Sequence, residues 1–136
     1  PPAPVPRPPM SPEEKRAYGQ AVHRILQCRR KGQNGTILDL RGLGLTTLPP
    51  EIGQLSALTK LYLHSNQLST LPPEIGQLSA LTQLYLNDNR LTALPPEIGQ
   101  LSDLTELYLE KNQLTTLPPQ IGQLSALKVL NLQITY

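Results

Sequence analysis

The sequence predicts an α/β solenoid: a right-handed stack of short units, with parallel strands along its concave face and an N-terminal helical cap. Three observations carry this prediction. The stretch LPPEIGQLSALTKLYLHSNQLST (48–70) returns almost letter for letter at 71–93 and 94–116, and a partial copy follows. Each copy contains a period-two alternation, which is typical of a strand. A capped helical pattern precedes the copies. Self-similarity at such a period indicates units that pack only on their neighbours.

Composition limits the core and the partners. The 136 residues fit one domain and contain neither Trp nor Phe, so Leu and Ile must build the core. Residues 1–34 hold seven Lys or Arg against two Glu, whereas residues 35–136 hold five against eight acidic residues. The repeat body is therefore mildly acidic. The basic run Arg29, Arg30 and Lys31 is short and lacks aromatic partners, so we interpret it as a solvated helix end and expect no nucleic-acid partner.

Cysteine use and apolar runs bear on location. Cys28 is the single cysteine, which excludes an internal disulfide and favours a reducing compartment. We expect a cytoplasmic protein, delivered into a host cell if it is an effector. No apolar run reaches transmembrane length and no signal peptide is visible, so we expect no membrane partner. The triplet Asn34, Gly35 and Thr36 matches a glycosylation sequon, which we interpret as a turn before the first strand.

Two segments precede the repeats. Residues 1–10 are proline-rich and are expected to be a disordered lead-in; their PxxP spacing suits polyproline-binding domains, but a linker explains it more simply. Residues 11–34 are expected to form an amphipathic capping helix and turn. Ser11 and Glu14 form a capping box around Pro12, which predicts a helix over residues 12–30. Apolar residues at helical spacing define one predicted apolar stripe, which comprises Tyr18, Ala21, Val22, Ile25 and Cys28, with Leu26 beside them.

Residues 35–136 are expected to form about 4.5 units of 23 residues. With Leu58 at position 1, the unit follows LxxLxLxxNxL, and the alternation around Tyr62 predicts a short strand whose leucines face the core. Pro and Gly keep the return segment irregular or in short helical turns. An Asn occupies position 9 in three units, at Asn66, Asn89 and Asn112. We assign these amides to folding, because at the turn they can bond unpaired backbone groups of adjacent units.

These units resemble the leucine-rich repeat family, specifically its 23-residue class with LPxxIGxL in the return segment. The resemblance covers about residue 36 onward. It is similar to repeats of bacterial, Ras-suppressor-like and Roco-type proteins, and it implies a recognition module, alone or attached to an enzymatic domain. The first unit departs from the pattern with Gly35 at position 1 and Leu43 at position 9, and the last has Thr135 there. We expect the helix to cap the first unit. The uncapped last unit should be covered by further sequence or another chain, or should self-associate.

Variation between copies is concentrated at the solvent-facing positions 3, 5, 7 and 8. Tyrosine occupies position 5 in three successive units and should form an amphipathic stripe. A residue of high β-propensity that merely fills the strand would give the same pattern, so that alternative stays open for the tyrosines alone. A charge gradient across the face adds weight to binding. The predicted partner-binding residues are Tyr62, Tyr85, Tyr108, Lys60, His64, Asn87, Asp88, Glu106 and Glu110.

Catalytic and metal-binding patterns find little support. A triad of His64, Asp88 and Ser65 would sit on an open sheet without an oxyanion hole. His64 and Glu110 lie two strands apart, so their roots are about 10 Å apart, which disfavours a shared metal. We expect no enzyme, no cofactor and no metal here, but a protein partner on the concave face. The alternative is the substrate-targeting part of a larger signalling enzyme or bacterial effector, a GTPase or ubiquitin ligase. A purely structural surface protein is the third possibility.

Overall fold

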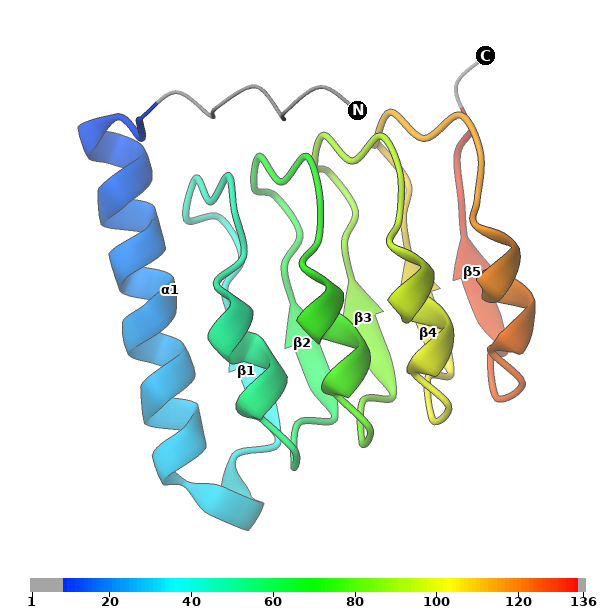
Figure 1. The fold of residues 1–136 in the computed structure, drawn as a ribbon, viewed down its shortest axis with the longest axis horizontal. Helices are drawn as coiled ribbons and strands as arrows, with labels where there is room; N and C mark the ends of the chain where they lie inside the picture. The colour runs from blue at the N-terminus through cyan, green and yellow to red at the C-terminus, as the bar shows by residue number, and fades with distance from the viewer. Residues whose placement is uncertain (1–8, 135–136) are drawn as a thin grey trace, which may run out of the picture.

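A single helix and a single sheet make up the stack. The computed structural model describes residues 9–134. Helix α1 (Pro12–Arg30) is followed by a parallel sheet whose strands pair in sequence order, which are β1 (Ile37–Asp39), β2 (Lys60–Tyr62), β3 (Gln83–Tyr85), β4 (Glu106–Tyr108) and β5 (Val129–Asn131). Figure 1 shows α1 beside β1 at one end and β5 at the other. The predicted solenoid with an N-terminal helix is confirmed. Residues 1–8, with the predicted lead-in and PxxP motifs, lie outside the described residues.

Helix α1 begins at the predicted capping box. Ser11 Oγ accepts a hydrogen bond from Glu14 N at 3.1 Å, and Glu14 Oε1 accepts one from Ser11 N at 3.4 Å. The helix covers the predicted residues, but only part of the predicted apolar stripe is buried. The buried residues are Ala17, Ala21, Ile25 and Cys28, whereas Tyr18, Val22 and Leu26 are only half-buried. The helix contacts one end of the stack only, so a narrow stripe centred on small residues suffices.

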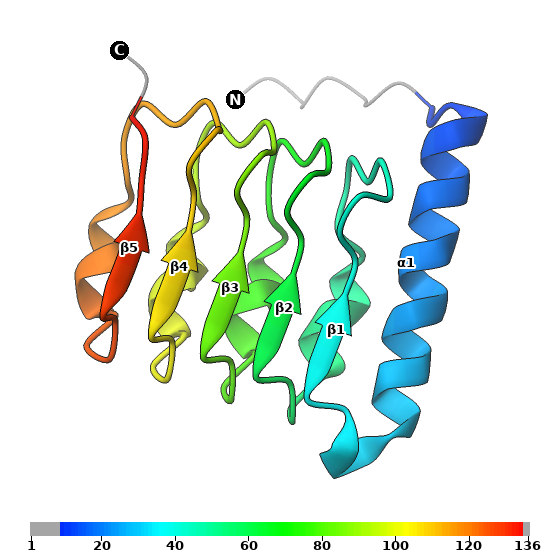
Figure 2. The ribbon, with the colours of Figure 1, turned by 180° about the vertical axis from the view of Figure 1, so that it is seen from behind.

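The strands are in exact repeat register. Leu61 pairs with Leu84, and Leu84 pairs with Leu107, so residues at one repeat position form a row across the sheet. Figure 2 shows the strands side by side from behind. Leu61 is 0% exposed, while Lys60 and Tyr62 on either side of it are half-buried on the other face of the sheet. The alternation predicted from the sequence is therefore confirmed.

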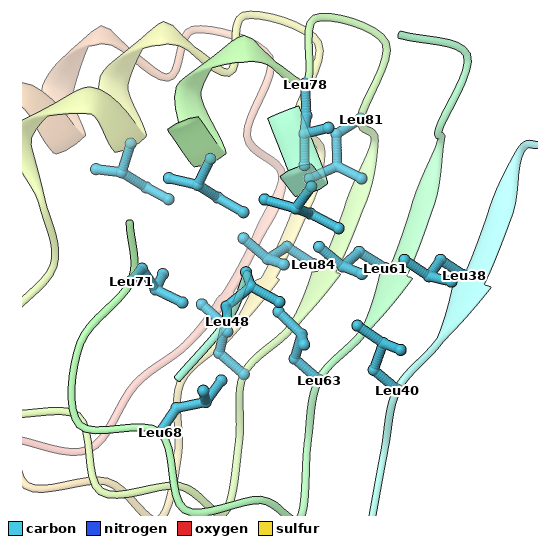
Figure 3. Packing of buried hydrophobic residues seen from close by; sticks show 14 of the residues in the cluster. Leu38, Leu40, Leu48, Leu61, Leu63, Leu68, Leu71, Leu78, Leu81 and Leu84 are labelled. Carbon is cyan, nitrogen blue, oxygen red and sulfur yellow. The ribbon is translucent and has the colours of Figure 1, made fainter. Parts of the chain in front are cut away.

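Rows of leucine form the core between the strands and the return segments. Figure 3 shows Leu38, Leu61 and Leu84 in one row, with Leu40 and Leu63 in the next. Burial of each such side chain stabilises the fold by about 1.5–3 kcal/mol. Because a row belongs to several units, a unit gains this stabilisation only when a neighbour covers it.

Each return segment makes one short 3-10 turn on the convex side, as in residues Pro73–Gln77. Proline suits the start of the turn, because the backbone N–H group that it lacks would be unpaired there. Its ring also fixes φ at a value that the turn can use. Gly76 allows a close approach between turns, because a Cβ there would lie 2.8 Å from the carbonyl oxygen of Glu97 in the next unit. Glycine thus lets successive turns pack tightly against one another.

The position-9 asparagines join neighbouring units, as predicted. Asn66 Oδ1 accepts hydrogen bonds from the backbone N–H groups of Leu43 and Leu45, each at 3.0 Å. Its Nδ2 donates to the carbonyl oxygens of Leu40 at 2.9 Å and Leu63 at 3.0 Å. Asn89 and Asn112 bond the equivalent groups of their units. These buried amides satisfy backbone groups that would otherwise be unpaired.

Helix α1 takes the place of a preceding unit. Arg24 Nη1 donates to the Asp39 carbonyl oxygen at 2.9 Å. Gly35 stands where other units have Leu because a Cβ there would collide with the backbone carbonyl group of Cys28. Leu43 replaces Asn at position 9, where an amide would have no preceding repeat unit to bond, and instead packs against the core. Both departures of the first unit therefore follow from its contact with the helix.

Candidate functional site

The concave face is built from the strand residues that point away from the leucine core. Positions 3 and 5 lie on the strands themselves, and position 7 follows two residues later on the same face. Three tyrosines at position 5 occupy neighbouring strands, with Tyr62 paired to Tyr85 and Tyr85 paired to Tyr108 in the sheet register. The parallel register therefore turns a sequence repeat into one contiguous feature, which we call the tyrosine stack.

The rings of the tyrosine stack are in direct contact. The ring centroids of Tyr62 and Tyr85 lie 4.9 Å apart with planes inclined by 23°. Those of Tyr85 and Tyr108 lie 4.6 Å apart and are nearly parallel, at 4°. Both spacings are close to the roughly 4.8 Å between strands, so the backbone itself sets the stacking distance. Aromatic pairs of this kind contribute about 0.5–1.5 kcal/mol beyond their buried area, so the rings are ordered before any partner arrives.

Hydrogen bonds fix the hydroxyl ends of two rings. Tyr108 Oη donates to Glu106 Oε1 at 2.6 Å, and Tyr85 Oη donates to Gln83 Oε1 at 3.3 Å. Gln83 Nε2 donates to Glu106 Oε2 at 3.0 Å, so a continuous series of hydrogen bonds links the two tyrosine hydroxyl groups. The bond to Glu106 is the main cause that raises the pKa of Tyr108 to about 12, with burial and nearby negative charge adding to it. Burial, and then the charge of Glu106, raises the pKa of Tyr85.

His64 at position 7 packs edge-on against the stack. Its ring centroid lies 6.0 Å from that of Tyr62 and 5.9 Å from that of Tyr85. Its Nδ1 and the Oε2 atom of Glu110, two units further along, are the buried side-chain polar atoms without a hydrogen-bond partner among residues 9–134. Both lie on the concave face at position 7. Buried polar atoms without a hydrogen-bond partner are rare in folded proteins.

Position 8 has a backbone conformation that the sequence does not suggest. Ser65, Asp88 and Lys111 have φ values of 60°, 59° and 59°, and Gly42 in the first unit has 67°. This left-handed region favours Gly and tolerates Asp, but is unfavourable for Lys. The variation at position 8 therefore does not by itself mark a recognition position. Among the predicted residues, Asp88 is exposed at this turn, and Asn87 before it is half-buried.

The structure joins five of the nine predicted residues through direct contacts, which are Tyr62, Tyr85, Tyr108, His64 and Glu106. Lys60 and Glu106 lie on β2 and β4, two strands apart, and do not pair with each other. Gln83 bridges Tyr85 and Glu106 but is missing from the prediction. Its position on β3 between Lys60 and Glu106 was the available signal, because residues at one repeat position become neighbours.

The remaining geometry gives no sign of bond-making chemistry. Ser65 Oγ donates to Asp88 Oδ2 at 3.5 Å, an arrangement unlike that of a nucleophile bonded to His64 as base. Within residues 9–134, no three His, Cys, Asp or Glu side chains are placed to hold a metal ion. In the same part of the chain, no helix has both the length and the apolar character needed to cross a membrane. A shallow cavity lies beside Cys28 and Gln54, near the end of α1.

Comparisons with known proteins identify the repeats. Residues 34–91 and 79–135 match a family model described as leucine rich repeat. The structure of a leucine-rich-repeat protein from Leptospira interrogans is similar, with 56% identity and a TM-score of 0.65, over 65% of this chain and 23% of that one. The functional domain of InlJ from Listeria monocytogenes, which includes a cysteine ladder, has 35% identity and a TM-score of 0.62, over 71% of this chain and 20% of that one. No curated protein matches. The chain thus spans less than a quarter of either similar chain.

Proposed function

Since this chain belongs to the leucine-rich repeat family, we propose that it is a recognition module that binds a partner protein through its concave face. Domains of this family are generally protein-interaction modules and are typically non-catalytic. The observation that carries the proposal is the tyrosine stack, whose three rings touch one another on the side of the sheet opposite the core. Tyrosine is among the residues that dominate binding energy at protein interfaces.

The side chains of the tyrosine stack are held in fixed positions before a partner binds, and this favours binding. A side chain that is mobile in the free protein loses conformational entropy when a partner fixes it. Tyr85 is held between two rings and by Gln83, and Tyr108 is held by Glu106. These side chains are therefore arranged in advance, and a partner would meet rigid ring edges with polar ends.

The charges of the face would orient that partner. Lys60 and His64 lie beside Tyr62 on the N-terminal part of the face, and Glu106 and Glu110 lie beside Tyr108. Opposite charges at the two ends of a face favour one direction of approach and speed association more than they add affinity. We assign Asn87 and Asp88, between these ends, to the rim.

We also propose the narrower 23-residue class with LPxxIGxL returns, found in bacterial, Ras-suppressor-like and Roco-type repeats. The second candidate function is the substrate-targeting part of a larger signalling enzyme or bacterial effector. It is favoured by one observation: the similar bacterial chains are more than four times longer than the matched segment. A cytoplasmic location is proposed because Cys28 is a single, buried and unpaired thiol.

The test is affinity capture followed by calorimetry on the purified partner. Tyr85→Ala is expected to weaken binding by about 2 kcal/mol, roughly thirtyfold, because it empties the centre of the stack. Gln77→Ala, on the convex side, serves as the control and should bind as the wild type does. A partner that loses affinity with Gln77→Ala and keeps it with Tyr85→Ala uses the other side, and the proposal is then wrong.

The second candidate function is tested on the full-length gene product. If the segment targets an enzyme, the full-length protein should chemically modify the captured partner or alter its nucleotide state, and Tyr85→Ala should abolish that effect. A full-length protein that binds the same partner without altering it supports a stand-alone recognition module.

A further inference from the structure

Helix α1 carries a cluster of basic side chains that the concave-face proposal does not use. Six are exposed, and we call them the basic face, which comprises Lys15, Arg16, Arg24, Arg29, Arg30 and Lys31. The acidic residues of the helix, Glu13 and Glu14, lie in its first turn, and no Asp or Glu follows until Asp39. Residues 35–136, with five basic and eight acidic residues, have a net charge of −3. Positive charge is therefore concentrated at one end of the stack.

The basic face is not neutralised within the protein. The ion pair formed among residues 9–134 joins Arg41 to Asp39 and involves no residue of α1. Arg24 donates to a backbone carbonyl group, and Glu14 is engaged by Ser11 and Thr46. From Lys15 to Lys31 the cations extend over about 24 Å of helix, because each residue rises 1.5 Å. Such a row of unpaired cations attracts polyanions.

Apolar side chains lie among these cations. Val22 and Leu26 are half-buried, and they fall on the same side of the helix as Lys15 and Arg30, because residues four, seven and eight apart share one face. Ile37, which at 54% is the most exposed large hydrophobic residue of the described chain, occupies position 3 on the concave face and is not part of this surface.

We propose that the outer side of α1 docks this protein onto an anionic lipid surface. The headgroup layer of a membrane takes up cations and small apolar side chains together, whereas a nucleic-acid backbone uses the cations alone. Tyr18, the aromatic residue of α1, is half-buried and close to Glu51, so it is not presented for stacking on a base. The combination of Leu26 and Val22 with the basic face therefore favours lipid.

The position of α1 makes this contact compatible with partner binding. Figures 1 and 2 show the helix at the end of the stack, with its axis alongside β1 and no other element of residues 9–134 beyond it. A lipid surface against α1 would meet the end of the solenoid and leave the concave face open to the side. From the sequence alone, the run Arg29, Arg30 and Lys31 favours a solvated helix end, and we expect no membrane partner because no apolar run reaches transmembrane length. Docking on a lipid surface replaces that expectation, because it needs no spanning segment. The structure adds three more cations and the apolar side chains to the same surface.

The experiment is sedimentation with vesicles of phosphatidylcholine, with and without phosphatidylserine. Binding is expected only to the anionic vesicles and should fall as salt rises. Each basic residue near such a surface contributes about fivefold, so Arg16→Gln, Arg30→Gln and Lys31→Gln combined should lower the affinity by about a hundredfold. The matched control removes the same charge from the repeat body, with Arg90→Gln, Lys111→Gln and Lys128→Gln. It should change the affinity less than threefold. Thermal melts establish that both variants are folded.

Leu26→Gln separates lipid from nucleic acid. It should weaken binding to anionic vesicles severalfold and leave any binding to a DNA duplex unchanged. The proposal is overturned if wild-type protein does not bind anionic vesicles at low salt. Equal loss in both triple variants also overturns it, because net charge and not the basic face would then be responsible. If the protein binds duplex DNA and Leu26→Gln leaves vesicle binding unaffected, α1 docks on nucleic acid instead.

Discussion

The first and the last unit of the stack both have leucine at positions 4 and 6, yet the two ends differ in what covers these side chains. Leu38 of the first unit is 4% exposed and Leu40 is 0% exposed. Their counterparts in the last unit, Leu130 and Leu132, are 38% and 36% exposed. At the first end, α1 and the second unit enclose the leucines. At the other end, within the residues described, nothing lies beyond β5.

The difference shows that burial in this molecule is a property of neighbours and not of residue type. A leucine at a core position enters the core only when a second layer closes over it. Helix α1 provides that layer with small and branched residues, Ala21 and Ile25 among them, and with polar contacts at its sides. The open end has the same leucines without that layer.

The largest expected effect comes from breaking the covered end. Ile25→Asp should lower the free energy of unfolding by about 3–5 kcal/mol, because it places an unpaired charge in the contact between helix and first unit. The matched change at the open end, Leu130→Asp, should cost less than about 1 kcal/mol, because its carboxylate can reach water. Urea unfolding followed by circular dichroism measures both. If the two variants lose similar amounts of unfolding free energy, Ile25 and Leu130 are equally shielded from water and the comparison of the two ends is wrong.

A smaller effect is expected from position 8, where the first and the fourth units use different residues for one backbone conformation. Gly42 and Lys111 share the left-handed backbone, with φ of 67° and 59°. Lys111→Gly should stabilise the protein by up to about 1 kcal/mol, because it removes the steric strain of a Cβ in that region. Gly42→Lys should destabilise by a similar amount. Thermal melts compare the two, and a destabilised Lys111→Gly would show that side-chain contacts outweigh the strain.

The chain of residues 1–136 should also self-associate weakly through its last unit, unless further sequence covers that unit. Leu130 and Leu132 expose apolar surface beside the unpaired edge of β5, which can pair with another chain. Analytical ultracentrifugation at millimolar concentration should detect species larger than the monomer, and Leu132→Glu should reduce them. A monomer at every concentration would contradict the expectation, and Ile25→Asp is unsuitable as a control because it exposes the other end.

The smallest effect concerns the ionisation of the Tyr108 hydroxyl group, at the acidic end of the concave face. The pKa of Tyr108 is raised from 10.0 to about 12, chiefly by its hydrogen bond to Glu106. Because the folded value lies above the unfolded one, the stabilisation is present below pH 10.0 and is lost as the pH rises toward about 12. Ultraviolet titration of tyrosinate should show this ionisation move down in Glu106→Gln. Tyr108→Phe identifies the signal, and Glu97→Gln on the convex side should leave it in place.

Local patterns were sufficient to predict the elements. The capping box at Ser11 and Glu14 and the basic last turn set both ends of α1, because caps act through residues a few positions apart. The alternation around each tyrosine set the strands, and the position-9 asparagines were assigned correctly to the backbone because their spacing repeats without variation.

Features that depend on contacts between units could not be predicted in the same way. How much of the apolar stripe on α1 is buried depends on the surface that the helix meets, which the spacing of Tyr18 and Val22 does not reveal. The stacking of the tyrosines was expected as a row, but the bridge through Gln83 to Glu106 depends on side-chain torsions. The left-handed backbone at position 8 could not be predicted from Asp88 and Lys111, because only Gly favours that conformation. Gly42 in the first unit is the residue that indicates it. Which residues of the concave face bind a partner stays a prediction.

The asparagine joints have a consequence for how such a protein can grow. Asn89 contacts backbone atoms of the preceding unit, the N–H group of Leu68 and the carbonyl group of Leu63, and no side chain. A side chain that hydrogen-bonds only to backbone atoms can bond to any unit with the same backbone conformation, whatever its side chains are. Duplication of one 23-residue segment of the gene would therefore yield a unit that fits at once on both sides, and the face would lengthen by about 4.8 Å without redesign of its interior. The near-identical copies in this chain are what such a history of duplication leaves behind.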